Sequence, residues 1–203
     1  MKLYFAPGSC ALASHIALYE TGLEFSVEQV DLKSKTTAGG QDFKIINHKG
    51  YVPALQLLDG QVLTEGPAIL QYIADRKPES RLAPAAGTFE RYRLQEWLNY
   101  ITAELHKSFS PLFKPDTPED YKVAVKDALK AKFAFLEEAL QGKLFLMGEQ
   151  FTVADAYLFT VLRWAPITKI DMSQFPNLQQ YQQRVKARPA VHKALEAQGL
   201  VKH

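Results

Sequence analysis

Residues 2–11 read Lys-Leu-Tyr-Phe-Ala-Pro-Gly-Ser-Cys-Ala, a pattern typical of a strand that leads through a tight turn into a helix. Its first half is a short apolar run typical of a buried strand, and Pro7-Gly8 is a turn signal that ends it. A helical pattern starts near Ala11, so Cys10 lies at the first turn of a helix. Unpaired backbone N–H groups and the positive end of the helix dipole favour an anion there. The sequence therefore predicts a thiol that ionises more easily than that of free cysteine, and a candidate nucleophile.

Cys10 is the single cysteine among 203 residues, so it forms no internal disulfide. Redox or nucleophilic work by this thiol needs a second thiol from outside, and a small thiol such as glutathione is the obvious donor. The alternative interpretation is a small buried apolar residue without a chemical role. A lone free thiol is also typical of a reducing compartment, so we expect a cytoplasmic protein.

The charge balance excludes several classes of partner. Lysine and arginine number 24 against 22 for aspartate and glutamate, and neither sign forms a long run. We therefore expect neither nucleic acid nor an anionic membrane as a partner. The apolar run at the amino terminus stops at Pro7, which is too short for a secretory signal, and no apolar segment is long enough to span a membrane.

Strand and helix patterns alternate along the first part of the chain and predict a βαβ unit followed by a ββα unit. Strands are expected at 2–6, 25–30, 52–58 and 61–63, and helices at 11–21 and 65–76. Asp59-Gly60, between the last two strands, is a strong hairpin signal. Two prolines and a glycine mark 78–87 as a linker, so we expect a first domain over 1–77.

The remaining residues, 88–203, are expected to form an all-helical domain. Apolar side chains recur at three- and four-residue spacing along its first helix and predict one core-facing stripe: Leu94, Trp97 or Leu98, Ile101, Leu105, Phe109 and Leu112. Thr117-Pro118 predicts the start of a second helix that Gly142 ends. The stretch 152–155 (Thr-Val-Ala-Asp) is a capping-box pattern before a helix that is apolar on nearly every side. We interpret Asp155 as a capping residue of this buried helix.

Four local features together resemble the cytosolic glutathione transferases over the whole chain. They are Cys10 at its turn, 50–55 (Gly-Tyr-Val-Pro-Ala-Leu), 63–66 (Leu-Thr-Glu-Gly) and 151–156 (Phe-Thr-Val-Ala-Asp-Ala). Cys10 combined with Asn99 and His106 resembles the bacterial Beta class, whose members keep a cysteine where most classes use a tyrosine or serine hydroxyl. The resemblance implies a thioredoxin-like first domain (βαβ-ββα), an all-α second domain, glutathione as co-substrate with no other cofactor, and a homodimer.

The resemblance also implies a glutathione site on the first domain. Pro53 in a thioredoxin-like fold is usually cis, which turns the Val52 backbone outward to pair with a peptide; alternatively, Pro53 merely starts a strand. Gly66 N–H at a helix start suits a carboxylate, and the Glu65 carboxylate suits an ammonium. Many relatives carry a hydroxyl residue after the acid, so Gly66 departs from the wider pattern. By resemblance, Lys35 would contact a terminal carboxylate of glutathione. The polar composition of the loop around Lys35 alone indicates a solvated lysine.

A polar face of the long helix completes the expected site. With about 100° of rotation per helical residue, Asn99, Ala103 and His106 are expected to share one face of the helix, away from the apolar stripe. By resemblance, Asn99 hydrogen-bonds the ligand and His106 approaches the sulfur, favouring the thiolate by charge or by hydrogen bonding. His15 is five residues from Cys10, off its helical face, and is not a persuasive base. Three further histidines show no metal-ligand spacing with the cysteine, so no metal site is expected: His48, His192 and His203.

We therefore expect a glutathione transferase that directs the glutathione thiolate at a hydrophobic electrophile, with thiol–disulfide exchange through Cys10. Cys10 and His106 are the expected catalytic residues. One alternative is a glutaredoxin-like monothiol reductase or peroxidase that uses the same site. Another is a non-catalytic module that binds glutathione or another ligand, since a fold alone does not decide function. The segments expected to line the electrophile pocket, 108–113 and 163–168, carry ordinary apolar and aromatic residues, so they do not identify the electrophile.

Overall fold

The structure, a computed structural model, describes residues 1–201, so His203 lies outside the described part of the chain. Its residues group into two compact units. The first is formed by Met1–Ala83 with the segment from Arg188 onward, and the second by Pro84–Ala187. No helix within residues 1–201 is both long and apolar enough to cross a membrane.

A five-stranded mixed sheet forms the centre of the first unit. Its strands are β1 (Lys2–Phe5), β2 (Ser26–Asp31), β3 (Thr36–Thr37), β4 (Ala54–Gln56) and β5 (Val62–Thr64), in the order β3-β2-β1-β4-β5. β1 pairs with β2 in parallel, and the other three pairings are antiparallel. The expected βαβ-ββα fold is confirmed, and the Asp59-Gly60 turn joins β4 to β5 as predicted.

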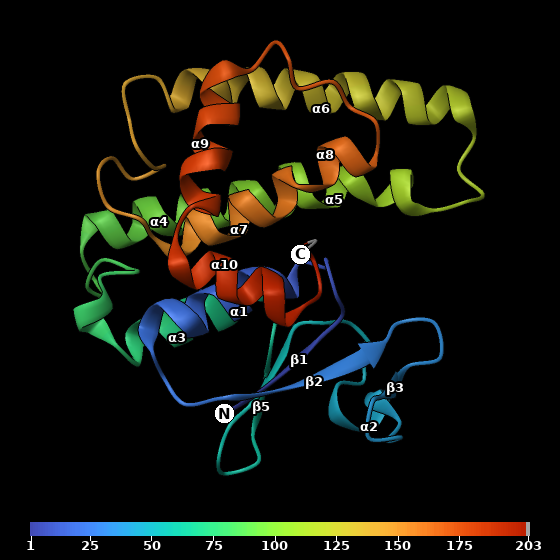
Figure 1. Cartoon of the computed structure of the whole chain (residues 1–203), viewed down its shortest axis with the longest axis vertical. Helices are drawn as coiled ribbons and strands as arrows, with labels where there is room; N and C mark the ends of the chain where they lie inside the picture. Colours follow the sequence, from blue (N-terminus) through green and yellow to red (C-terminus); the bar gives the residue numbers. More distant parts are fainter. Residues whose placement is uncertain (202–203) are drawn as a thin grey trace. The chain divides into compact units, whose positions relative to one another are not determined.

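Helices cover the sheet on both faces. α1 (Ala11–Thr21) and α3 (Gly66–Asp75) lie together on one side (Figure 1). α1 ends at Thr21, as predicted, and Gly22 follows as its C-cap with a φ of 65°. On the other side, Phe43 of α2 (Phe43–Ile46) packs on Tyr4, with ring centroids 5.6 Å apart. β3 and α2 were not predicted because elements of two and four residues are too short to show a period.

The C-terminal helix α10 (Pro189–Ala197) belongs to the first unit, whereas the helical pattern of the sequence predicts it as part of an all-helical domain over 88–203. It buries an apolar face and packs along α1 (Figure 1). Arg188, just before α10, forms a two-pronged ion pair with Glu20 near the end of α1, at 2.6 and 2.9 Å. A helical pattern does not say which unit a helix packs against, and this is the reason for the difference.

The second unit is entirely helical. In chain order it contains α4 (Phe89–Tyr100), α5 (Lys107–Phe109), α6 (Glu119–Ala139), α7 (Val153–Leu162), α8 (Trp164–Ile167) and α9 (Pro176–Lys186). All ten residues of α7 are buried, so the prediction of a buried helix behind a capping box is confirmed. Pro118 precedes α6 as its N-cap rather than as its first helical residue, and α6 ends at Ala139, before Gly142.

The predicted long helix is interrupted by a π-helical turn over Ile101–His106, between α4 and α5. Its apolar stripe is buried as expected from Leu94 to Phe109. The regular 100° step does not hold across the π turn, because its hydrogen bonds join residues five apart. Asn99 and Ala103 are exposed, and His106 is half-buried. The expectation that these three residues share one face stays a prediction.

Candidate active site

A tight turn carries Cys10 into α1. Ser9 N–H donates to the Ala6 carbonyl at 3.1 Å, and Gly8 between them has a φ of 71°. This combination is a type II turn, which needs a left-handed residue at its third position and therefore favours glycine there. The Ser9 hydroxyl also donates to the Ala6 carbonyl at 2.7 Å. Cys10 follows as the N-cap of α1, where the sequence placed it.

The Cys10 thiol is protonated at neutral pH, and the expectation of an easily ionised thiol is wrong. Its Sγ donates to the Val52 carbonyl at 3.4 Å, and the residue is only partly exposed. Burial raises the pKa of Cys10 to about 12, and the Glu65 carboxylate adds to the rise. The backbone N–H groups of Cys10 and Ala11 lower the pKa, as expected for a helix start, but by less than burial raises it.

The loop before β4 presents its backbone beside this thiol. The Val52–Pro53 peptide bond is cis, as expected. Among residues 1–201, Val52 N–H makes no hydrogen bond, while its carbonyl faces Cys10. Lys35 joins the same loop, because its Nζ donates to the Gly50 carbonyl at 2.9 Å and lies 5.5 Å from the centre of the Tyr51 ring. Lys35 is therefore held at this loop rather than freely solvated.

The start of α3 holds the other two expected residues. Glu65 is its N-cap and has a φ of 70°, a conformation that costs a residue other than glycine about 1–3 kcal/mol. Its carboxylate is paired with Lys49, and its side chain is 67% exposed. Gly66 is the first residue of this helix, and its N–H is a free donor at the helix start. Pro67, the next residue, has no N–H to offer. A Cβ added at Gly66 meets no atom within 4 Å, so there is room at this position for the hydroxyl side chain that many relatives carry.

His106 lies in the second unit, among aromatic side chains. Its Nδ1 is 2.7 Å from the Tyr157 hydroxyl, and its ring centroid is 4.9 Å from that of Trp164. Burial lowers the pKa of His106 to about 4, and the Lys107 charge adds to the fall. His106 is therefore neutral at neutral pH, which excludes support of a thiolate by charge and leaves support by hydrogen bonding.

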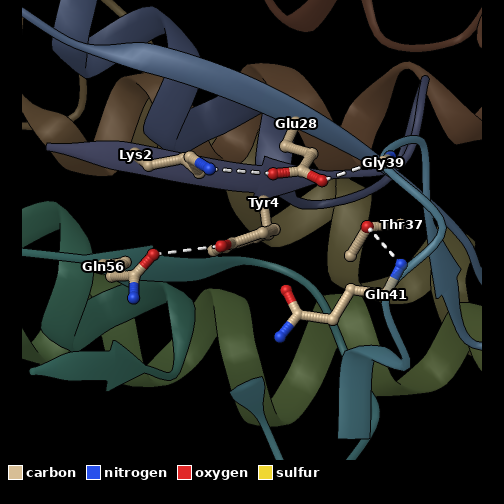
Figure 2. Close-up of polar contacts among 7 residues, drawn as sticks. All are labelled: Lys2, Tyr4, Glu28, Thr37, Gly39, Gln41 and Gln56. Carbon is tan, nitrogen blue, oxygen red and sulfur yellow. Dashed lines mark hydrogen bonds and ion pairs between the residues drawn. The ribbon is translucent and has the colours of Figure 1, made fainter. Parts of the chain in front are cut away.

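Tyr4, on β1, is hydrogen-bonded through its hydroxyl within the sheet. Figure 2 shows its hydroxyl directed at Gln56, with an oxygen-to-oxygen distance of 3.0 Å, and the Lys2–Glu28 ion pair beside it. Burial raises the pKa of Tyr4, which disfavours its ionised form. Tyr4 is therefore a packing residue of the sheet.

The structure brings some of the expected site residues together and shows further residues beside them that were not predicted from the sequence. Within the first unit, Cys10 meets the Val52–Pro53 loop, Lys35 is tied to that loop, and Glu65 begins α3. Lys49, Tyr157 and Trp164 were missed. Lys49 follows no pattern in a polar loop, whereas the hydroxyl of Tyr157 on a largely apolar helix was a signal that could have been used. Among residues 1–201, no group of three or more His, Cys, Asp or Glu side chains is arranged to hold a metal ion.

Known families and structures match the chain over nearly its full length. Residues 1–75 match the glutathione S-transferase N-terminal domain and residues 100–189 the glutathione S-transferase C-terminal domain. Glutathione S-transferase GstA of Escherichia coli O157:H7 is 49% identical over 200 residues, which cover 98% of this chain and all of the relative.

Two solved structures give the same assignment. A bacterial beta class glutathione S-transferase of Sphingomonas chungbukensis superposes with a TM-score of 0.97 at 48% identity, over 99% of this chain and 100% of the other. A sphingomonad glutathione S-transferase complexed with glutathione has a TM-score of 0.96 at 47% identity, with the same coverage. The resemblance noted in the sequence is thus confirmed, and the chain belongs to the glutathione S-transferase family, as a glutathione S-transferase of the kind found in the bacterial Beta class.

Proposed function

We propose that this transferase binds glutathione on its first unit, between the Val52–Pro53 loop and the start of α3. The observation that carries the proposal is the unpaired Val52 N–H beside a carbonyl that faces Cys10 Sγ at 3.4 Å. An outward-facing backbone edge of this kind pairs with a peptide. Gly66 N–H suits the α-carboxylate of the γ-glutamyl group, and the exposed Glu65 carboxylate suits its ammonium. Lys35, at the same loop, suits the glycine carboxylate of the peptide.

The chemistry follows from the protonation states of the two sulfur-directed residues. The glutathione thiolate attacks an electrophile, a carbon–sulfur bond forms, and the leaving group departs with the electron pair of the broken bond. Cys10 keeps its proton and donates its S–H to the glutathione sulfur, which stabilises the thiolate. His106 and Asn99 act as neutral hydrogen-bonding groups, and Ala103 leaves room for the ligand. Proximity and thiolate stabilisation supply the rate enhancement.

The electrophile is hydrophobic in this proposal. Next to His106, Trp164 packs edge-on against Phe113, with centroids 5.7 Å apart, and Phe113 is 50% exposed. An exposed aromatic surface beside a proposed catalytic residue suits an apolar or aromatic electrophile.

Thiol–disulfide exchange through Cys10, as in a monothiol reductase or peroxidase, is the second candidate. A single cysteine that faces the proposed glutathione site favours it. The raised pKa of about 12 opposes it at neutral pH, because the thiolate is the attacking form. We therefore place conjugation first and disulfide exchange second.

We also propose a homodimer in a reducing compartment such as the cytoplasm. On α4, Phe89 is 66% exposed and Tyr92 58% exposed, three residues apart and therefore on one face of the helix. Large apolar side chains grouped in this way favour a protein interface. Light scattering at micromolar concentration tests the assembly, and a monomer there contradicts it.

Calorimetric titration with glutathione, followed by a conjugation assay with a panel of halogenated aromatics, tests the proposed function. Glu65→Gln removes the proposed ammonium partner and should weaken glutathione binding about tenfold, or about 1.4 kcal/mol. Glu79→Gln is the matched control, because Glu79 is also exposed and paired with a lysine, Lys77, but lies outside the proposed site. Equal effects of both variants contradict the proposed site. Binding without conjugation of any electrophile favours a non-catalytic module.

A further inference from the structure

The peptide before Cys10 is held by the far end of the chain. In the type II turn over residues 6–9, the N–H of the third residue points away from the turn and needs an acceptor elsewhere. For Gly8 that acceptor is Gln198 Oε1, at 3.1 Å. Gln198 follows α10, is 5% exposed and lies 190 positions along the chain from Gly8.

The orientation of the Gln198 amide is determined by its two partners. Gly8 N–H only donates, so the amide oxygen faces it and the amide nitrogen faces the opposite side. On that side Gln198 Nε2 donates to His15 Nδ1 at 3.2 Å. His15 Nδ1 must therefore accept this hydrogen bond, so the neutral His15 ring carries its proton on its own Nε2.

His15 is immobilised by its surroundings, so it can hold Gln198 in one orientation. The ring is fully buried. It stacks on Tyr19, with centroids 5.0 Å apart and an interplanar angle of 18°. It also makes an edge contact with Phe25 at 5.5 Å and a tilted contact with Phe5 at 5.8 Å. Burial also lowers the pKa of His15 to about 4, which agrees with the neutral form that the amide requires.

Both ends of α10 are thus tied to α1. At one end Arg188 forms an ion pair with Glu20, and at the other end Gln198 is hydrogen-bonded to His15 and Gly8. Beyond Gln198, the chain also covers the turn, since a Cβ built on Gly8 would lie 3.7 Å from Leu200 Cδ2. A peptide flip at Gly8 would separate its N–H from Gln198 and change the backbone angles two residues before Cys10.

We propose that Gln198, oriented by His15, is a positioning residue for Cys10: it holds the Gly8 peptide and thereby keeps the Cys10 thiol against the Val52 carbonyl. Without this acceptor the bonds of Ser9 to the Ala6 carbonyl remain, but the Gly8 peptide is held less firmly, so the thiol leaves its buried hydrogen bond more often. The catalytic consequence rests on the proposed function. The positioning itself does not, because it concerns the reactivity of the thiol alone.

Alkylation of Cys10 by iodoacetamide tests the proposal without glutathione, and the single cysteine makes intact-protein mass spectrometry unambiguous. Gln198→Met keeps the side-chain length and removes the acceptor. We expect its alkylation rate at pH 8 to rise about tenfold, with an apparent thiol pKa that falls from about 12 towards the ordinary value of about 8.5. Lys193→Met, on the exposed face of α10, is the matched control and should leave the rate unchanged.

Gln198→Glu separates positioning from stability. It keeps an acceptor for Gly8 N–H but loses the donor to His15, so it should lower the melting temperature while its alkylation rate stays within about twofold of wild type. Equal rate increases in the Met and Glu variants, or no increase in Gln198→Met, overturn the proposal.

A measurement on the unaltered protein covers the case in which the variants do not fold. Nitrogen NMR should show the His15 proton on Nε2, and the Gly8 amide should exchange slowly with solvent. A proton on Nδ1, or a Gly8 amide that exchanges like an open loop, overturns the proposal. Loss of glutathione binding with the alkylation results intact would instead contradict the proposed function alone.

Discussion

Lys132 of α6 donates its Nζ to the Glu104 backbone carbonyl at 2.6 Å, inside the π turn that carries His106. The same ammonium bonds the Glu104 carboxylate at 2.8 Å and the Ser108 hydroxyl at 3.0 Å. The Ser108 hydroxyl donates to the same carbonyl at 2.6 Å. These side-chain donors supply partners for a carbonyl where the regular helical ladder is interrupted, and thus stabilise the π turn.

Replacing Lys132 by methionine should therefore disturb the placement of His106. We expect the kcat of conjugation to fall on the order of tenfold with KM for glutathione nearly unchanged, since a small misplacement of a catalytic group is costly. The measurement is steady-state kinetics beside the imidazole NMR shifts of His106. Lys130→Met removes a surface ion pair with Asp127 on the same helix and is the control. Unchanged His106 shifts in Lys132→Met would contradict the role of this contact.

Asp155→Ala should cost more stability than a helix cap usually does. The buried carboxylate accepts hydrogen bonds from Leu146 N–H at 2.9 Å, Thr152 N–H at 2.8 Å and the Tyr181 hydroxyl at 3.1 Å. Alanine leaves these donors buried without partners, so we expect a loss of about 3–5 kcal/mol rather than the roughly 0.5–2 kcal/mol of a simple cap. Chemical denaturation measures it, with Asp171→Ala, an exposed carboxylate bonded to Ser173, as control. A loss below about 1 kcal/mol would show that the network contributes little.

Asp155 should also make stability depend on pH in an unusual direction. Burial raises the pKa of Asp155 from 3.8 to about 6 in the folded protein. A raised carboxyl pKa means that the folded state binds the proton more tightly than the unfolded state. The contribution of Asp155 is therefore fully present below about pH 4 and is lost as the pH rises through about 6. Unfolding free energies at pH 4, 5, 6 and 7 should show this decline in the wild type relative to Asp155→Asn, and parallel curves would contradict it.

Covalent capture by oxidised glutathione should be slow at neutral pH. The Cys10 thiolate would attack one sulfur of the disulfide, leaving a protein–glutathione disulfide and one glutathione thiolate. Because the pKa of Cys10 is about 12, we expect the rate to keep rising above pH 8.5, with one adduct that dithiothreitol removes. Intact-protein mass spectrometry across a pH series measures it. A rate that levels off near pH 7 would indicate a thiol activated in solution.

Cys10→Ala is the companion variant. Binding is assigned to backbone pairing at Val52 and to the charges of Glu65 and Lys35, so this variant should bind glutathione within about tenfold of wild type, or about 1.4 kcal/mol. A larger loss would make Cys10 a principal anchor of the ligand.

Gly66→Ser should strengthen glutathione binding. The open space around a Cβ at this position admits a hydroxyl that can donate to the proposed α-carboxylate. A hydrogen bond to a charged group contributes about 1.5–3 kcal/mol, which corresponds to a Kd at least about tenfold lower. Gly66→Ala controls for the loss of backbone freedom. Equal affinities of the Ser and Ala variants would show that no carboxylate lies there.

The sequence predicted the elements well and the local environments less well. The cis Val52–Pro53 bond, the sheet and the buried α7 helix follow from local patterns or from the resemblance. The pKa of Cys10 was predicted in the wrong direction, because a helix start is visible in the sequence whereas the packing that desolvates a thiol is not. The π turn was missed for the same kind of reason. It depends on Lys132, 28 residues from Glu104, and no local period reports such a contact.

The place of α10 also bears on how the chain is made. Synthesis proceeds from the amino terminus, and early domains usually fold as they emerge. Here the first unit includes the segment that follows Ala187, which leaves the ribosome after Pro84–Ala187. The face of α1 that packs against α10 remains uncovered until then, although α3 already packs against this helix. The helical unit can thus be completed during translation before the first unit is closed.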